Sequence, residues 1–255
     1  MFDLKQMELF AGIGGFGLGG RWTGIESTVQ VEWNPYCRKI LKKNFPNAIQ
    51  HGDITTFDGT PYRGTIDIIS GGFPCPPYST AGKRLGESDD RALWPQMLRV
   101  IKEVAPRWVV GENVVGITNL DGGSPLRCFR DDLENIGYQV ELYDIPAYSV
   151  GLQTVERHIW IIAKANGRRQ QRSKKNKNKD DGIEREFQGA NTGEFRRWNI
   201  SETRFCSVGE RVSRRMARHQ RDGLKAVGNA IPPQVAYQIF KAIIQYEKDV
   251  RPTQV

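Results

Sequence analysis

The chain has 255 residues, 38% of them hydrophobic, and carries 37 Lys and Arg against 29 Asp and Glu, for a formal net charge of +8. This length suits one large domain, alone or with a small appendage, and excludes a miniature disulfide-stapled scaffold. No segment approaches the roughly 20 apolar residues of a membrane helix, and the four cysteines form no Cys-x-x-Cys pair. We therefore expect a reduced, cytoplasmic protein with no membrane association and no metal site.

Short apolar segments alternate with helical patterns along residues 1–165. The pattern predicts strands at 7–12, 27–33, 48–53, 65–73, 107–114, 139–145 and 158–165, and helices at 34–45, near 90–104 and near 125–136. Asn34 and Pro35 are typical of a helix N-cap followed by the first helical position. The alternation predicts an α/β fold with a doubly wound, mostly parallel sheet and helices on both faces.

The regular pattern ends near Asn166. Residues 166–225 are basic and irregular, and residues 231–247 then form an amphipathic pattern whose apolar face should pack back on the first domain. We predict one main domain from residues 1–165 plus 226–255, and a small basic region at 166–225.

The basic charge is concentrated between Lys164 and Lys225, where 18 of the 37 basic residues but only 8 of the 29 acidic ones lie. The rest of the chain is nearly neutral. Such asymmetry indicates a polyanionic partner, most often nucleic acid. For the run at 168–181 alone, we favour a solvated, flexible insert.

A glycine-rich turn, GIGGFG at 12–17, follows the first predicted strand. Such glycines let the backbone approach a ligand at a helix N-terminus, although the motif alone is weak. Glu32 follows 20 residues after Gly12, where an acid accepts hydrogen bonds from ribose hydroxyls. Trp33 is placed to stack on an adenine and Asp53 to accept from its amino group. An adenosine ligand is predicted, either NAD or S-adenosylmethionine; alternatively Glu32 is a solvated strand end and Trp33 a core residue.

The segment GGFPCPPYST at 71–80 places Cys75 among three prolines, directly after a predicted strand. The prolines make this loop stiff and extended, which suits either a positioned thiol nucleophile or an inert turn. Glu112 follows the end of another strand, so the fold brings thiol, carboxyl and ligand to one crevice.

This combination matches the methylation of cytosine, whose C5 is a poor nucleophile. Thiolate addition at C6 with protonation at N3 turns the ring into an enamine that can attack a methyl sulfonium. The base must leave the stack to be reached. An inert turn at Cys75 would leave Glu112 unexplained.

With these residues in place, the chain resembles the DNA cytosine-5 methyltransferases over residues 7–165 and 225–240, with its motifs in the family's order. The matching segments are LFAGIGGF, VEW, GDI, FPCPPYSTAG, ENV and GNAIPPQVA. The resemblance implies a class I, Rossmann-like fold and S-adenosylmethionine as the cofactor. The cofactor-binding residues it implies are Phe10, Gly12, Gly14, Glu32, Trp33, Asp53, Ile54, Pro74 and Asn229.

The resemblance also implies catalytic roles. Cys75 attacks C6, Glu112 serves N3, and Arg157 contacts the ring through a charge-assisted hydrogen bond; the alternative for Arg157 is a surface ion pair. Ser79 lies near the target phosphate, and we expect a structural or phosphate role for His158. The remaining candidates for DNA phosphate contacts are Lys83, Arg84, Arg211, Arg214 and Arg215, with a solvated loop as the alternative for the first two.

The chain departs from the family's pattern in three places. The segment QTVERHIW keeps Gln153 and Arg157 but has Val155 where an Arg is common. Pro76 stands where many members have Gln. The basic region, which in the family reads the target sequence, is short and contains no base-reading motif that we recognise.

We therefore expect methyl transfer from S-adenosylmethionine to C5 of a flipped cytosine in double-stranded DNA, through a covalent Cys75 adduct. The resemblance implies a monomeric bacterial or phage enzyme that can be paired with a restriction endonuclease. The sequence leaves open a cytosine-5 methyltransferase acting on tRNA, an NAD-dependent oxidoreductase and a non-catalytic DNA-binding relative.

Overall fold

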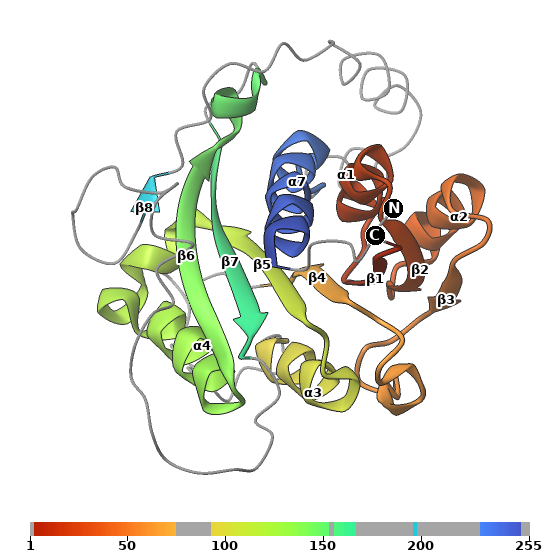
Figure 1. Ribbon diagram of the computed structural model, residues 1–255, viewed down its shortest axis with the longest axis horizontal. Helices are drawn as coiled ribbons and strands as arrows, with labels where there is room; N and C mark the ends of the chain where they lie inside the picture. The colour runs from red at the N-terminus through yellow and green to blue at the C-terminus, as the bar shows by residue number, and fades with distance from the viewer. Residues whose placement is uncertain (1–2, 75–92, 153–155, 167–195, 198–229, 251–255) are drawn as a thin grey trace.

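The computed structural model describes residues 3–74, 93–152, 156–166, 196–197 and 230–250 (Figure 1). Within these ranges one sheet has the strand order β3-β2-β1-β4-β5-β7-β6-β8. The strands are β1 (Lys5–Leu9), β2 (Glu26–Val31), β3 (Ile49–His51), β4 (Ile68–Gly72), β5 (Trp108–Val114), β6 (Tyr138–Pro146), β7 (Arg157–Ala165) and β8 (Arg196–Arg197). Strands β1 to β5 pair in parallel, whereas β7 runs antiparallel between β5 and β6.

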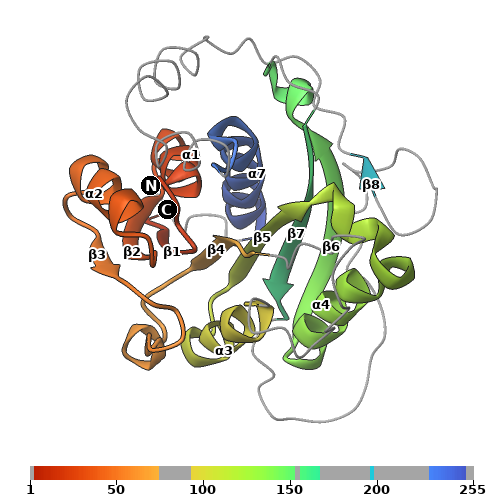
Figure 2. The same cartoon turned by 180° about the vertical axis from the view of Figure 1, so that it is seen from behind.

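Helices cover both faces of this sheet, so the predicted doubly wound α/β architecture is confirmed. The α-helices are α1 (Gly15–Thr23), α2 (Pro35–Asn44), α3 (Trp94–Val104), α4 (Ser124–Asn135) and α7 (Pro233–Val250), and the short 3₁₀ helices are η1 (Thr60–Tyr62), η3 (Val115–Gly123) and η4 (Ala147–Val150). α1 and α7 lie side by side on one face, and α3 and α4 cover the other (Figures 1 and 2). None of the described helices is both long and apolar enough to span a bilayer.

The strand order places a topological switch between β1 and β4. The chain runs from β1 outward to β2 and β3, then crosses back to β4 on the other side of β1. In open α/β sheets, ligands bind at such a point, in the crevice beyond the carboxyl ends of the strands. β1 leads here into the glycine-rich turn, and β4 leads into Pro74.

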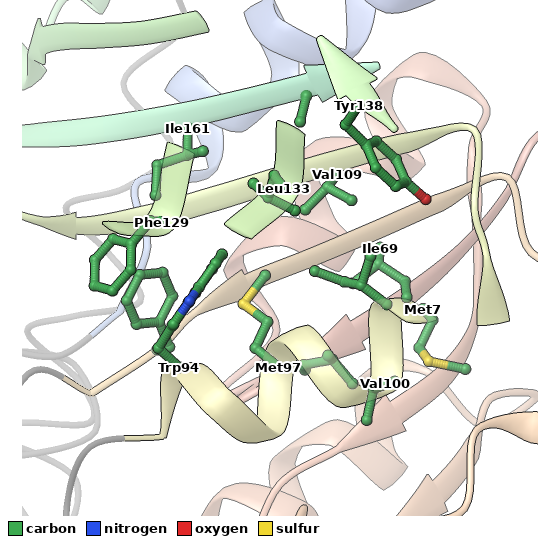
Figure 3. Close-up of a cluster of buried hydrophobic side chains, with 14 of the residues drawn as sticks. Met7, Ile69, Trp94, Met97, Val100, Val109, Phe129, Leu133, Tyr138 and Ile161 are labelled. Carbon is green, nitrogen blue, oxygen red and sulfur yellow. The ribbon is translucent and has the colours of Figure 1, made fainter. Parts of the chain in front are cut away.

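A buried apolar cluster fills the space between α3, α4 and the sheet (Figure 3). α3 contributes Met97, Val100, Ile101 and Val104, whose helical spacing puts all four on the buried face. Phe73, directly after β4, packs against the rings of Trp94 at 5.1 Å and Phe129 at 5.0 Å between centroids. This aromatic contact anchors the start of the Pro-Cys loop to the helical layer.

The C-terminal helix α7 packs on α1, as the amphipathic pattern predicted. Phe16 of α1 meets Trp160 of β7 edge to face, with ring centroids 5.7 Å apart, and also contacts Phe240 of α7. A Cβ on Gly19 would lie 2.8 Å from the Cβ of Ala236, so the two helices approach too closely for a side chain at position 19. This close packing places the residues before α7 beside the carboxyl edge of the sheet.

One acid lies in the middle of the sheet, away from solvent. Glu8 of β1 is 0% exposed. Burial raises the pKa of Glu8 to about 7, against the opposing effect of hydrogen bonds from the Gly17 backbone, the Gln30 side chain and the Phe16 backbone. Those backbone donors belong to the first turn of α1, so Glu8 connects the central strand to the helix that follows it.

We predict that Glu8 makes stability depend on pH between its ordinary pKa of 4.5 and about 7. In this window the folded protein keeps a proton that the unfolded chain releases, so stability falls as pH rises. A shift of this size corresponds to about 3 kcal/mol. Urea unfolding of the wild type and Glu8→Gln, followed across the window, should give a flatter dependence for the variant. Equal slopes would contradict the prediction; His158 is common to both proteins, so its titration cancels.

Candidate functional site

The turn after β1 leaves an open backbone surface at the start of α1. Phe10, Gly12 and Gly14 have φ values of 53°, 55° and 91°, in the left-handed region. Position 14 must also lack a side chain, because a Cβ on Gly14 would lie 2.5 Å from the Phe45 ring. A Cβ on Gly12, by contrast, would have no atom within 4 Å. A ligand can therefore approach the backbone at Gly12 directly.

Glu32 holds this turn from the end of β2. It is 6% exposed, and its two carboxylate oxygens accept from the backbone N–H of Gly12 at 2.7 Å and of Asn34 at 2.8 Å. The Asn34 side chain in turn accepts from the N–H of Tyr36, which confirms the predicted N-cap of α2. The interpretation of Glu32 as a solvated strand end is wrong. Because a carboxylate oxygen accepts more than one hydrogen bond, Glu32 can also receive ribose hydroxyls.

Trp33 and Asp53 follow the ends of the paired strands β2 and β3. Trp33 is 76% exposed, so its interpretation as a core residue is wrong, and its ring is available for stacking. Asp53 is exposed, and a hydrogen bond from the Thr55 backbone, with a second from its side chain, lowers the pKa of the carboxyl. Asp53 is thus an anionic acceptor at neutral pH. Ile54 is buried, and it fixes this turn in the core.

Sequence reasoning missed one residue that braces this turn. Arg99 of α3 donates to the carbonyl oxygens of Ile54 at 2.6 Å and Phe57 at 2.9 Å, and pairs with Glu103 at 2.6 Å. Glu103 also accepts from the backbone N–H of Gly59 at 2.8 Å. The four-residue spacing of Arg99 and Glu103 signals a helical ion pair. Nothing local identifies the turn that they hold.

Glu112 lies beside the end of β4 and is enclosed by Gly72, Ile231 and His158. It is 7% exposed and pairs in register with Gly72. A Cβ on Gly72 would lie 2.7 Å from Glu112 Oε2 and 2.7 Å from Ile231 Cδ1, so this position tolerates only glycine without movement. On the other side, Glu112 Oε1 lies 2.5 Å from Nδ1 of His158.

The contact with Glu112 changes the pKa of the His158 imidazole. Burial lowers the pKa of His158, but the hydrogen bond and charge of Glu112, with the charge of Glu156, outweigh that effect and raise it above 6.5. The contact with Glu112 therefore favours the protonated form of the imidazole.

Asn113 faces the opposite side of β5 and ties the two strand ends together. Its Nδ2 donates to the carbonyl oxygen of Phe73 at 3.0 Å, and its Oδ1 accepts from the N–H of Val114 at 2.9 Å. The buried amide thereby fixes the point from which the Pro-Cys loop leaves the sheet. Pro74 is exposed at that point. The other predicted site residues, Cys75, Ser79, Lys83, Arg84, Arg211, Arg214, Arg215 and Asn229, lie outside the described residues, as do Gln153 and Val155.

The structure does not bring Arg157 to Glu112. The Arg157 guanidinium binds Asp144 of β6 and is 47% exposed, which is the surface ion pair of the alternative interpretation. Successive side chains of a strand point to opposite faces, so His158, the next residue, faces Glu112 instead. The sequence predicts only a structural or phosphate role for His158, and the structure adds its contact with Glu112.

The chain is similar in sequence to known proteins over much of its length. Residues 4–204 match the family model described as C-5 cytosine-specific DNA methylase. The Type II methyltransferase M.Eco47II of Escherichia coli is 40% identical over 134 residues, which are 52% of this chain and 32% of that protein. M.PspPI of Psychrobacter sp. (strain TA137) is 40% identical over 149 residues, 56% of this chain and 36% of that protein. M.HhaI of Haemophilus parahaemolyticus is 30% identical over 167 residues, 64% of this chain and 50% of that protein. These matches span from about a third to half of each relative's length.

Solved structures share the fold. A mutant of Spodoptera frugiperda DNMT2 aligns with a TM-score of 0.55 at 21% identity, covering 69% of this chain and 54% of that one. The Entamoeba histolytica methyltransferase EhMeth aligns with a TM-score of 0.55 at 17% identity, covering 67% of this chain and 56% of that one. The similarity shows the fold alone, which is the predicted class I, Rossmann-like methyltransferase fold.

The contact between His158 and Glu112 gives a prediction for titration by NMR. Followed through its imidazole C–H signals, His158 should titrate above 6.5, whereas His51, whose pKa is lowered by burial, should titrate below it. Glu112→Gln removes the carboxylate charge and should lower the pKa of His158 while leaving that of His51 unchanged. His158→Asn assigns the signal. An unchanged His158 titration in Glu112→Gln would show that the two side chains do not interact.

Proposed function

The chain belongs to the C-5 cytosine-specific DNA methylase family, and from this premise we propose that it transfers a methyl group from S-adenosylmethionine to C5 of cytosine in double-stranded DNA. The observation that carries the proposal is the enclosure of Glu112 beside Gly72, because the chain runs from Gly72 through only two residues to Cys75. A carboxyl and a thiol are then available to opposite parts of one flipped ring.

We propose the following roles for the chain's own residues. The Cys75 thiolate adds to C6 while Glu112 gives a proton to N3, which makes C5 nucleophilic. S-adenosylmethionine supplies the electrophilic methyl group that C5 accepts. Loss of the C5 proton to a base or water then lets Cys75 leave and restores the aromatic ring. Flipping the cytosine out of the duplex gives these residues access to the ring.

The residues at the β1 and β2 ends fit an adenosine cofactor. Gly12 is open to close approach, Glu32 can accept from ribose hydroxyls, and exposed Trp33 offers a stacking surface. Asp53 is an anionic acceptor suited to the adenine amino group. We further propose that Phe10, Gly14, Ile54, Pro74 and Asn229 line the remainder of this site.

The basic region at 166–225 supports double-stranded DNA as the partner, because its charge suits the phosphate backbone. We propose that it reads the target sequence and that residues 1–165 plus 226–255 form the catalytic domain. Phosphate contacts are assigned to Ser79, Lys83, Arg84, Arg211, Arg214 and Arg215.

The relatives are Type II methyltransferases, and we propose that the chain can likewise be paired with a restriction endonuclease. We further propose that it is a cytoplasmic, monomeric enzyme. An NAD-dependent oxidoreductase would use the glycine-rich turn but would leave Cys75 and Glu112 without a role.

We predict that Cys75→Ala abolishes methylation, because the activating adduct at C6 cannot form. Bisulfite sequencing of plasmid and chromosomal DNA from expressing cells should show 5-methylcytosine in one short context with the wild type and none with the variant. Cys128→Ala, which alters an exposed cysteine of α4, is the matched control and should retain the pattern. Methylation by Cys75→Ala would refute the nucleophile, and absence of methylation by the folded, cofactor-binding wild type would refute the DNA substrate.

We predict that Gly72→Ala lowers the rate of methylation at least tenfold while leaving cofactor binding intact. The added Cβ would lie 2.7 Å from Glu112 Oε2 and would displace the carboxyl from its place beside the Pro-Cys loop. The control is Gly116→Ala, because nothing lies within 4 Å of a Cβ at Gly116. Equilibrium binding of S-adenosylmethionine and single-turnover methyl transfer separate the two effects. Equal transfer rates in Gly72→Ala and Gly116→Ala would contradict the predicted role of this close approach.

A further inference from the structure

We propose that His158 is a positioning residue for Glu112, holding one carboxylate oxygen so that the other faces the cytosine. The inference rests on the proposed function and adds to it a residue to which neither the sequence nor the family resemblance assigned this role. Its basis is the contact of 2.5 Å between His158 Nδ1 and Glu112 Oε1, formed where β5 and β7 pair.

The contact between His158 and Glu112 follows from the register of the sheet. In the antiparallel pair β5 and β7, Glu112 lies opposite Trp160, and Val114 lies opposite His158. Glu112 and His158 are therefore diagonal neighbours on one face, a separation that long side chains bridge. Trp160, two residues further along β7, is 0% exposed and packs under α7. Rotating the strand so that His158 points away from Glu112 would therefore expose Trp160.

The two carboxylate oxygens of Glu112 have different neighbours. His158 occupies Oε1, while Oε2 lies on the side of Gly72 and Ile231. That side is the end of β4, from which the chain runs to Cys75. A carboxyl held in this way keeps Oε2 at the end of β4, on the side where the proposed function places the base.

The charges around His158 favour the same role. Within the described residues, Glu112 acts on the imidazole from β5 and Glu156 from the segment before β7. Arg157 and Asp144 pair with each other through side chains on the opposite face, and the segment before α7 presents the apolar Ile231. The principal interaction of the imidazole is therefore with the carboxyl that serves the reaction.

The positioning role of His158 applies to each step of the proton transfer between Glu112 and the cytosine. When Glu112 acts as the acid, its Oε2–H bond breaks and the N3–H bond of cytosine forms, which leaves a carboxylate. The Nδ1–H of His158 donates to Oε1 throughout and stabilises that carboxylate without giving up its own proton. When the adduct breaks down, the proton returns from N3 to Oε2. His158 thus acts through Glu112 and does not itself touch the base.

Three variants separate positioning from simple packing. His158→Asn places an amide N–H near the position of Nδ1, whereas His158→Gln places the same group near Nε2, out of reach of Oε1. His158→Leu fills similar volume with no donor. Single-turnover methyl transfer to duplex DNA, the KM for DNA and the affinity for S-adenosylmethionine are measured for each, together with thermal unfolding.

We expect His158→Leu and His158→Gln to lower the transfer rate about 100-fold, the scale of a general acid that is no longer aligned. His158→Asn should remain within about tenfold of the wild type, with KM and cofactor affinity changed less than about threefold in all three. The wild type should also show a pH dependence of the rate near neutrality that His158→Asn lacks. Comparable rates for Asn, Gln and Leu, whether high or low, would overturn the inference.

The proposed function and this inference fail in different ways. If the wild type methylates cytosine and His158→Leu does so equally well, the inference is wrong and the function stands. If the wild type methylates no cytosine, the proposed function is wrong, and the inference with it, even where the imidazole titration still responds to Glu112→Gln.

Discussion

The parallel pairing of β4 with β1 on one side and β5 on the other aligns the carboxyl ends of three strands. Leu9 lies opposite Gly71, and Gly72 lies opposite Glu112. This register brings the glycine-rich turn, the start of the Pro-Cys loop and the buried carboxyl to one edge. A slip of one residue in β5 would turn Glu112 to the face of α3 and α4, because strand side chains alternate. The chemistry of the site thus depends on a register that apolar packing on both faces enforces.

Burial of an acid is unfavourable unless the surroundings compensate for it. In this sheet the compensation differs between two acids. Glu8 has backbone and amide donors and lies between the buried polar residues Gln30 and Ser70, yet its complete burial raises its pKa to about 7. Glu112 lies at the carboxyl edge of the sheet, where the His158 imidazole lies within hydrogen-bonding distance of its carboxyl. The position along a strand therefore decides whether a buried carboxyl is a structural connection or a group with access to a substrate.

The sequence predicted what depends on local pattern. The approximate positions of the strands, the Asn34 N-cap and the placement of Glu32 directly after the second strand follow from spacing within one unit of strand and turn. The face on which β7 presents its side chains does not, because both alternating sets of residues in HIWIIAKA contain apolar side chains. The sequence favoured Arg157 for contact with the base, whereas His158 is the residue that faces Glu112. The brace between Arg99 and Ile54 was also beyond local reasoning, since it joins α3 to a turn 45 residues earlier.

Ile231 connects the cofactor turn to the carboxyl from the far end of the described chain. A Cβ on Gly15 would lie 2.4 Å from its carbonyl oxygen, and a Cβ on Gly72 would lie 2.7 Å from its Cδ1. Two glycines therefore make room for one residue that precedes α7. Since these contacts join distant parts of the sequence, they carry a large entropic cost and form only when α7 docks on α1. The same docking that completes the apolar core then closes the wall behind Glu112, so stability and the geometry of the site are coupled through α7.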